Sequence, residues 1–131
     1  MTRPIVDCHV HVVEPDRFPF VPGAGYQPRP DEAGTLGLFD ETLRRHGVGR
    51  ALVVQPSGYG TDNACLLDTL DRSSGRFRGI AVIDWDTPDR KLLDMQRRGV
   101  VGVRLNLPRS GADLLARPGA RDFLTRVASL N

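Results

Sequence analysis

Four short apolar runs, separated by amphipathic segments, constrain the fold of this chain more than any other feature. The runs are rich in Val, Ile and Leu, and we expect them to form buried strands over Ile5 to Val13, Arg50 to Gln55, Gly79 to Asp84 and Val100 to Leu107. Elsewhere apolar residues recur at spacings of three and four, which predicts helices over Leu36 to His46, Thr61 to Ser73, Pro88 to Arg98 and Gly119 to Leu130. This alternation predicts a parallel α/β sheet.

Local signals at the helix ends support these boundaries. Thr61 or Asp62 can cap the second helix, and Thr87-Pro88 is a typical start for the third. A glycine follows each of the first three helices, at Gly47, Gly75 and Gly99. Periodicity alone does not separate a small open sheet from part of a closed barrel, so the choice depends on the motifs.

Length and composition exclude several classes of protein. The 131 residues are enough for one domain, and the 18 basic and 16 acidic residues are scattered, so we expect no nucleic-acid partner. The first apolar run is short and carries an aspartate and two histidines, unlike a signal peptide or a membrane span, which favours a cytoplasmic protein. Cys8 and Cys65 lack the spacing of a metal site or redox pair, and we expect reduced, packed thiols.

The long connection over residues 14–34 has an unusual composition. It holds five of the ten prolines of the chain, together with the aromatic residues Phe18, Phe20 and Tyr26. Prolines lower the entropy lost on ordering, and aromatic side chains favour burial. We therefore expect this segment to be an ordered, lid-like cover over the strand ends.

The first strand carries the strongest candidate site. Because side chains alternate along a strand, Asp7, His9 and His11 share one face, and the apolar neighbours occupy the other. Two imidazoles two residues apart can hold one divalent metal such as zinc, or they can act without a metal by orienting substrate and stabilising charge. A purely structural alternative is that the two rings satisfy each other through hydrogen bonds.

Polar residues also follow the other three strands, as an active site at the carboxyl ends of parallel strands requires. They are Gln55 to Tyr59, Asp84 to Asp86 and Arg104 to Asn106. Arg104 continues an apolar run, so we expect a buried guanidinium that pairs with a ligand anion or with a carboxylate such as Asp84. The segment from Ser57 to Asn63 offers hydroxyls and backbone N–H groups to an anion, or forms a tight turn and a helix cap.

Three segments together resemble the amidohydrolase superfamily, and within it the 2-pyrone-4,6-dicarboxylate lactonase-like branch. They are Val6-Asp7-Cys8-His9-Val10-His11-Val12, Gln55-Pro56-Ser57-Gly58-Tyr59-Gly60-Thr61-Asp62-Asn63 and Gly102-Val103-Arg104-Leu105-Asn106-Leu107. The resemblance implies a (β/α)8 TIM barrel of roughly twice this length, of which residues 1–131 would be the N-terminal half. It also implies that His9 and His11 are catalytic or metal-binding, and that Tyr26, Ser57 and Arg104 hold a small anionic substrate.

The resemblance implies a hydrolase that acts on a small carboxylate-bearing lactone, ester or amide, with a decarboxylase of the same superfamily as an alternative. The histidines and the late-strand aspartate of strands five to eight have no counterpart in this sequence. Two imidazoles fall short of the protein ligands usual for a catalytic metal. Three further possibilities are a non-catalytic fragment, a half-barrel module that completes its barrel as a homodimer, and a small open-sheet binding domain.

Overall fold

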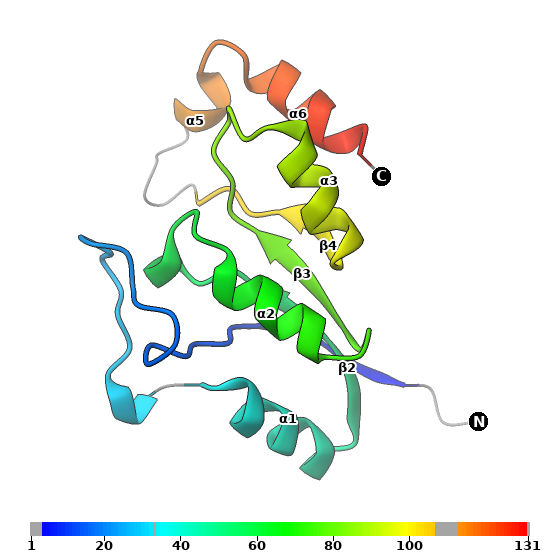
Figure 1. The fold of residues 1–131 in the computed structure, drawn as a ribbon. Coiled ribbons are helices and arrows are strands. Elements are labelled where there is room, and N and C mark those ends of the chain that lie inside the picture. Colours follow the sequence, from blue (N-terminus) through cyan, green and yellow to red (C-terminus); the bar gives the residue numbers. More distant parts are fainter. Residues whose placement is uncertain (1–3, 33, 107–112, 131) are drawn as a thin grey trace.

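A four-stranded parallel sheet forms the centre of the computed structural model, which describes residues 4–32, 34–106 and 113–130 (Figure 1). Its strands are β1 (Ile5–Val10), β2 (Val48–Val54), β3 (Phe77–Ala81) and β4 (Val100–Val103), in the spatial order β1-β2-β3-β4. The helices α1 (Leu36–Arg45), α2 (Ala64–Arg72) and α3 (Asp89–Arg97) alternate with them, and α5 (Asp113–Ala116) and α6 (Ala120–Ala128) follow β4. The predicted α/β alternation is confirmed.

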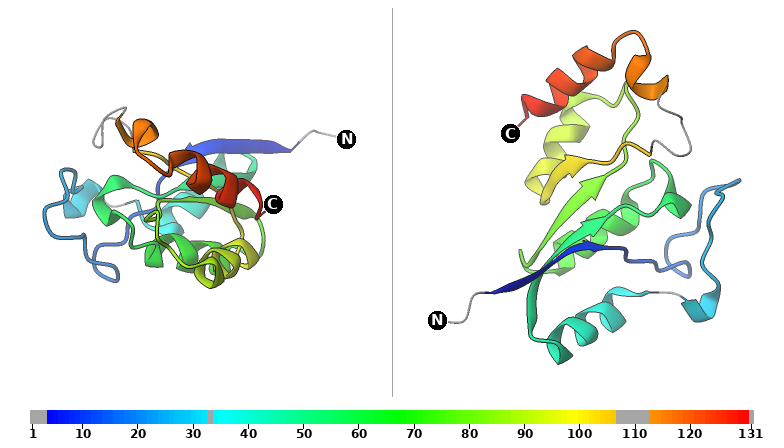
Figure 2. Two further views of the ribbon diagram at one scale, coloured as in Figure 1. Left: turned by 90° about the horizontal axis from the view of Figure 1, so that it is seen from above. Right: turned by 180° about the vertical axis from the view of Figure 1, so that it is seen from behind.

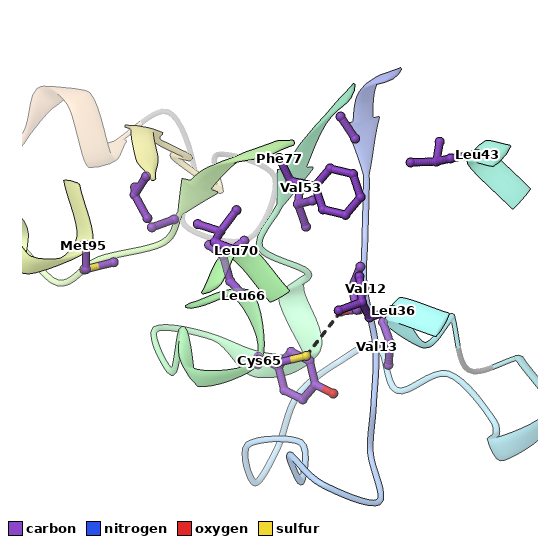
Figure 3. Packing of buried hydrophobic residues seen from close by; sticks show 14 residues of the cluster. Val12, Val13, Leu36, Leu43, Val53, Cys65, Leu66, Leu70, Phe77 and Met95 are labelled. Atoms are coloured by element: carbon purple, nitrogen blue, oxygen red, sulfur yellow. Dashed lines mark hydrogen bonds between the residues drawn. The ribbon is translucent and has the colours of Figure 1, made fainter. Parts of the chain in front are cut away.

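The hydrophobic core lies between the sheet and the first three helices. α1 packs on β2, α2 on β3 and α3 on β4, and Figure 2 shows the strands in front of α2 when the molecule is seen from behind. Figure 3 shows Val53 and Phe77 from the sheet close to Leu70 of α2, and the first two are 1% and 2% exposed. Gly79 permits this packing, because a β-carbon there would lie 2.7 Å from Cδ1 of Leu70.

The strands are shorter at their carboxyl ends than the apolar runs indicate. β1 ends at Val10, yet Val12 and Val13 beyond it are buried in the same core. An apolar run records burial, whereas strand assignment also requires ladder hydrogen bonds, so the two differ where the chain leaves the sheet. β3 likewise ends at Ala81, and the predicted end of the last strand, Leu107, lies outside the described residues.

The four predicted helices are present and differ from prediction mainly at the start of α2, whereas the short helix α5 was not predicted. Helix α2 begins at Ala64 instead of Thr61, because residues Ser57–Tyr59 form a 3-10 turn first. Asp62 still acts at this end, since its Oδ1 accepts a hydrogen bond from the backbone N–H of Ala64 (3.0 Å). The three glycines after the helices all have positive φ, at Gly47 (66°), Gly75 (78°) and Gly99 (104°), which explains why glycine is favoured there.

The segment over residues 14–34 packs on the connection between β2 and α2. The ring of Phe20 stacks on that of Tyr59 with 5.2 Å between centroids, and Val21 donates a backbone hydrogen bond to the carbonyl of Gly58 (3.1 Å). Arg17 binds the carboxylate of Asp68 on α2 through both terminal nitrogens, at 2.8 and 3.0 Å. These contacts hold the described part of the segment against α2 and the β2–α2 connection, although Tyr26 is 55% exposed, and the lid-like role stays a prediction.

Glu14 ties the beginning of this segment to its end. Its carboxylate is largely buried, and it accepts hydrogen bonds from the backbone N–H of Leu36 at the start of α1 (3.0 Å) and from Arg17 (2.9 Å). A carboxylate beside a helix N-terminus is also stabilised by the helix dipole. The buried carboxylate of Glu14 therefore connects the start of this segment to the start of α1.

The two cysteines differ in environment. Both are free, as expected, and Cys65 is buried with its thiol directed at the carbonyl of Val12 (3.7 Å). Burial raises the pKa of this thiol to about 11, because the thiolate would be desolvated. Cys8 is exposed, so the expectation of packing is wrong for this residue: it lies on β1, an edge strand of the sheet.

Within the described ranges, no helix combines the length and the apolar character that crossing a membrane requires.

Candidate functional site

The imidazoles of His9 and His11 lie side by side at the end of β1. Their ring centroids are 5.2 Å apart and the rings meet edge to face at 85°. The alternation of side chains along the first strand therefore brings these two residues together, as predicted. The carboxylate of Asp7 is engaged by the backbone, because its Oδ1 accepts a hydrogen bond from the N–H of His9 (3.1 Å). The register of the β1–β2 pairing also shifts between Asp7 and Val10.

His11 is held by the neighbouring strand in a way that fixes its tautomer. Its Nδ1 lies 2.7 Å from the carbonyl oxygen of Val54 at the end of β2. A carbonyl oxygen only accepts hydrogen bonds, so Nδ1 carries the proton, and in the neutral ring Nε2 is left with a lone pair. His11 can therefore accept a proton or bind a cation at Nε2 while its orientation is maintained.

Arg104, which follows the other edge strand β4, reaches the same end of β2. Its Nη1 donates a hydrogen bond to the carbonyl of Gln55 (3.2 Å). Gln55 directly follows Val54, whose carbonyl accepts the hydrogen bond from His11. Adjacent backbone carbonyls thus position an imidazole from just beyond β1 and a guanidinium from just beyond β4. The half-buried Arg104 forms no ion pair with Asp84, so this predicted partner is wrong; a carbonyl takes its place.

A pocket of about 570 Å³ lies at the carboxyl ends of β3 and β4, on the Arg104 side of this arrangement. Besides Arg104, its walls include Thr61, Trp85, Asn106 and Arg117. Trp85 is held there by stacking on Phe123 of α6, with ring centroids 5.1 Å apart. The pocket combines an aromatic surface and hydrogen-bonding groups with two arginines and the two carboxylates of Asp84 and Asp86, so an anion is favoured only beside the arginines.

The other two predicted substrate-binding residues lie on or beside the β2–α2 connection. Ser57 is half-buried at the start of the 3-10 turn. Gly58, the residue after Ser57, lies close to the backbone of Tyr26: a β-carbon on Gly58 would be 2.9 Å from the Tyr26 carbonyl oxygen. The side chain of Tyr26 is 55% exposed. The structure brings the backbone of Tyr26 to Gly58, the neighbour of Ser57, but the Tyr26 side chain does not line the pocket beside Arg104.

Two amides that the sequence does not single out hold this connection in place. The Nε2 of Gln55 donates to the carbonyls of Gly60 (3.1 Å) and Asp62 (2.7 Å). Asn63 binds the backbone of Val82 beyond β3 in both directions, donating to its carbonyl (2.7 Å) and accepting from its N–H (3.2 Å). Of the two predictions for the Ser57–Asn63 segment, the structure supports the turn and helix cap.

The metal-binding prediction is met only in part. The His9 and His11 rings are adjacent, and a backbone carbonyl fixes His11 as it commonly does in metal sites. Among the described residues, however, no three His, Cys, Asp or Glu side chains are grouped so that they could hold a metal ion. Catalytic metal sites usually have about three protein ligands, so the described residues do not form one by themselves.

Comparison with known proteins identifies the family. The amidohydrolase family model matches residues 6–131. The 2-pyrone-4,6-dicarboxylate hydrolase of Comamonas testosteroni is 34% identical over 127 residues, which cover 95% of this chain and 40% of that protein. The 4-sulfomuconolactone hydrolase of Hydrogenophaga intermedia is 34% identical over 102 residues, covering 75% of this chain and 32% of that protein.

Solved structures show the same relation. A probable 2-pyrone-4,6-dicarboxylic acid hydrolase from Acinetobacter baumannii, crystallised with citric acid bound, has 32% identity and a TM-score of 0.86 over 98% of this chain and 47% of its own. A putative 2-pyrone-4,6-dicarboxylic acid hydrolase from Pseudomonas putida has 32% identity and a TM-score of 0.83, covering 98% and 46%. The chain therefore spans less than half the length of these relatives, as expected for half of a (β/α)8 barrel, and it belongs to the amidohydrolase family.

Proposed function

We propose that this chain provides half of the active site of a hydrolase that opens a small carboxylate-bearing lactone or cleaves a related ester or amide. The observation that carries the proposal is the placement of His11 and Arg104 on the adjacent carbonyls of Val54 and Gln55. One group can take up a proton and the other can bind a carboxylate, at the strand ends where barrel enzymes hold their substrates. The names of the similar proteins support a lactone substrate.

The roles follow from the chemistry of the two groups. The guanidinium of Arg104 offers paired N–H donors to a substrate carboxylate and so orients the ring. His11, with its proton fixed on Nδ1, accepts a proton at Nε2 from the water that attacks the lactone carbonyl. The bond from the carbonyl carbon to the ring oxygen then breaks, and the proton passes to that oxygen. The adjacent His9 ring stabilises the charged imidazole edge to face.

Two cofactor proposals are compatible with this arrangement. A divalent metal such as zinc would need ligands beyond His9 and His11, and it would polarise the substrate carbonyl. A metal-free reaction would use the two imidazoles alone. Metal analysis of the purified protein, with activity measured before and after chelation, separates the two.

The anion site is tested by ligand binding, which does not require turnover. Trp85, the single tryptophan of the chain, lines the pocket with Arg104, so its fluorescence should report titration with 2-pyrone-4,6-dicarboxylate. Arg104→Met should weaken binding about tenfold or more, because a charge-assisted hydrogen bond is lost. The matched control is Arg121→Met on α6, an exposed arginine outside the pocket. Equal affinities in both variants would contradict the site.

The partner that completes the barrel is also a prediction. β1 and β4 are the two edges of the sheet, and their exposed residues include Val6 (45%) and Val101 (52%). We propose that a second copy pairs with these edges, so that two four-stranded halves close into one ring. Light scattering of the 131-residue chain should then give twice the monomer mass of 14.4 kDa. A folded monomer at every concentration would contradict this assembly.

A further inference from the structure

Gln55 connects three parts of the candidate site. It directly follows β2 and is fully buried, with 0% of its surface exposed. Its backbone N–H donates a hydrogen bond to the carbonyl of Ile80 on β3 (2.8 Å), and its own carbonyl accepts one from Arg104 (3.2 Å). Its side chain binds the β2–α2 connection. A change at this one residue therefore reaches both the guanidinium and the connection.

The position of the Arg104 guanidinium depends on the carbonyl of Gln55. The backbone of Arg104 is fixed separately, because its N–H donates to the carbonyl of Ala81 at the end of β3 (2.7 Å). From there the side chain reaches past β3 to the end of β2, where Nη1 meets the Gln55 carbonyl. Hydrogen bonds weaken as their geometry departs from the preferred angles, so the direction of this carbonyl determines where the guanidinium is held.

The sheet alone does not fix the direction of this carbonyl. β2 ends at Val54, and the residue after Gln55 is Pro56, which has no backbone N–H with which to continue the ladder. The side chain of Gln55 compensates, since its Nε2 donates to the carbonyls of Gly60 (3.1 Å) and Asp62 (2.7 Å). The connection thus closes back on Gln55, and the peptide group between Gln55 and Pro56 belongs to a closed loop.

The side-chain amide of Gln55 acts through its donor nitrogen. Its Oε1 is buried and makes no hydrogen bond within the part of the chain that the structure describes. The two bonds from Nε2 are therefore what the amide contributes to these contacts. A side chain of the same length without that donor would remove both bonds and leave the backbone contacts of Gln55 possible.

We propose that Gln55 is a positioning residue for Arg104. Its amide holds the connection, the connection holds the Gln55 carbonyl, and the carbonyl holds the guanidinium. The inference rests on the proposed function, because it assumes that Arg104 binds a substrate carboxylate. Gln55 itself does not line the pocket. It raises affinity by holding the guanidinium in place before the ligand arrives, so that less order has to be gained on binding.

The test is a double-mutant cycle of Gln55→Met and Arg104→Met, in which Trp85 fluorescence follows titration with 2-pyrone-4,6-dicarboxylate. Gln55→Met alone should raise the dissociation constant about fivefold, because the guanidinium is no longer held in one position. In the Arg104→Met background the same change should have less than about a twofold effect, since the group that Gln55 positions is absent. A residue that only stabilises the fold would weaken binding equally in both backgrounds.

Asn63→Leu is the matched control. Asn63 is a second buried amide on the same connection, but its side chain binds Val82 and Thr61 and not the loop that closes on Gln55. Any loss of affinity in Asn63→Leu should therefore be the same with and without Arg104. Gln55→Asn, which keeps an amide on a side chain one methylene shorter, should weaken binding less than Gln55→Met. Urea unfolding shows that each variant is folded during the titration.

The outcomes separate this inference from the proposed function. If Gln55→Met binds as tightly as the unaltered chain, or loses the same factor in both backgrounds, the positioning role is overturned while the anion site stands. The same conclusion follows if neither Gln55→Met nor Gln55→Asn folds, because the residue is then needed for the fold itself. If the unaltered chain does not bind the acid, the proposed function fails, and the inference that depends on it fails too.

Discussion

Replacing His11 with alanine is expected to lower the turnover of the lactone by at least about 100-fold, since general acid–base groups commonly contribute that much or more. The variant loses the Nε2 acceptor and the hydrogen bond from Nδ1 to the carbonyl of Val54. Binding should change far less, because Arg104 keeps its own contact with Gln55. The measurement is the loss of pyrone absorbance with time, alongside the fluorescence titration of Trp85.

The chain supplies its own control for this experiment. His46, the third histidine, is exposed and ends α1, far along the chain from the strand ends that hold the site. His46→Ala should turn over the lactone at the unaltered rate, and His9→Ala should lose activity as His11→Ala does. Unchanged turnover in both His9→Ala and His11→Ala would remove the imidazole pair from the reaction. Loss of binding together with turnover would assign His11 a role in holding the pocket.

The strand and helix order was predictable because it depends on local chemistry. Apolar runs of the sequence become strands, amphipathic runs become helices, and glycine follows helices where φ is positive, as at Gly75 and Gly99. The lengths were less predictable. Val12 and Val13 belong to the core but not to β1, because burial and backbone pairing end at different residues.

The candidate site was predictable to the extent that its residues depend on strand geometry. His9 and His11 come together because strand residues two apart share a face. The acceptor that positions Arg104 is the backbone carbonyl of Gln55. It could not be predicted, because every residue has a backbone carbonyl and the sequence does not show which one accepts. Arg117 was missed for a related reason: its approach to the pocket depends on a short helix that has no periodic signal.

The segment over residues 14–34 and the β2–α2 connection meet at Gly58. A β-carbon on Gly58 would lie 2.8 Å from Cδ1 of Phe20 and 2.9 Å from the carbonyl oxygen of Tyr26. Real β-carbons essentially never approach other heavy atoms so closely, and the second atom belongs to the backbone, which cannot turn aside as a side chain can. This glycine is therefore needed for the segment to close on the connection that carries Ser57.

Gly58→Ala is accordingly expected to lower the free energy of unfolding by about 1–3 kcal/mol, the usual cost of overpacking, and to displace residues 14–34. Gly37→Ala is the control, because Gly37 lies in α1 with no atom within 4 Å of its added β-carbon, and a helical alanine there should raise stability by about 0.5–1 kcal/mol. Urea unfolding measures both changes.

Trypsin should also cleave after Arg17 faster in Gly58→Ala, since release of the segment frees this guanidinium from Asp68. If both alanine variants unfold at the same urea concentration and resist trypsin equally, Gly58 does not hold the segment in place.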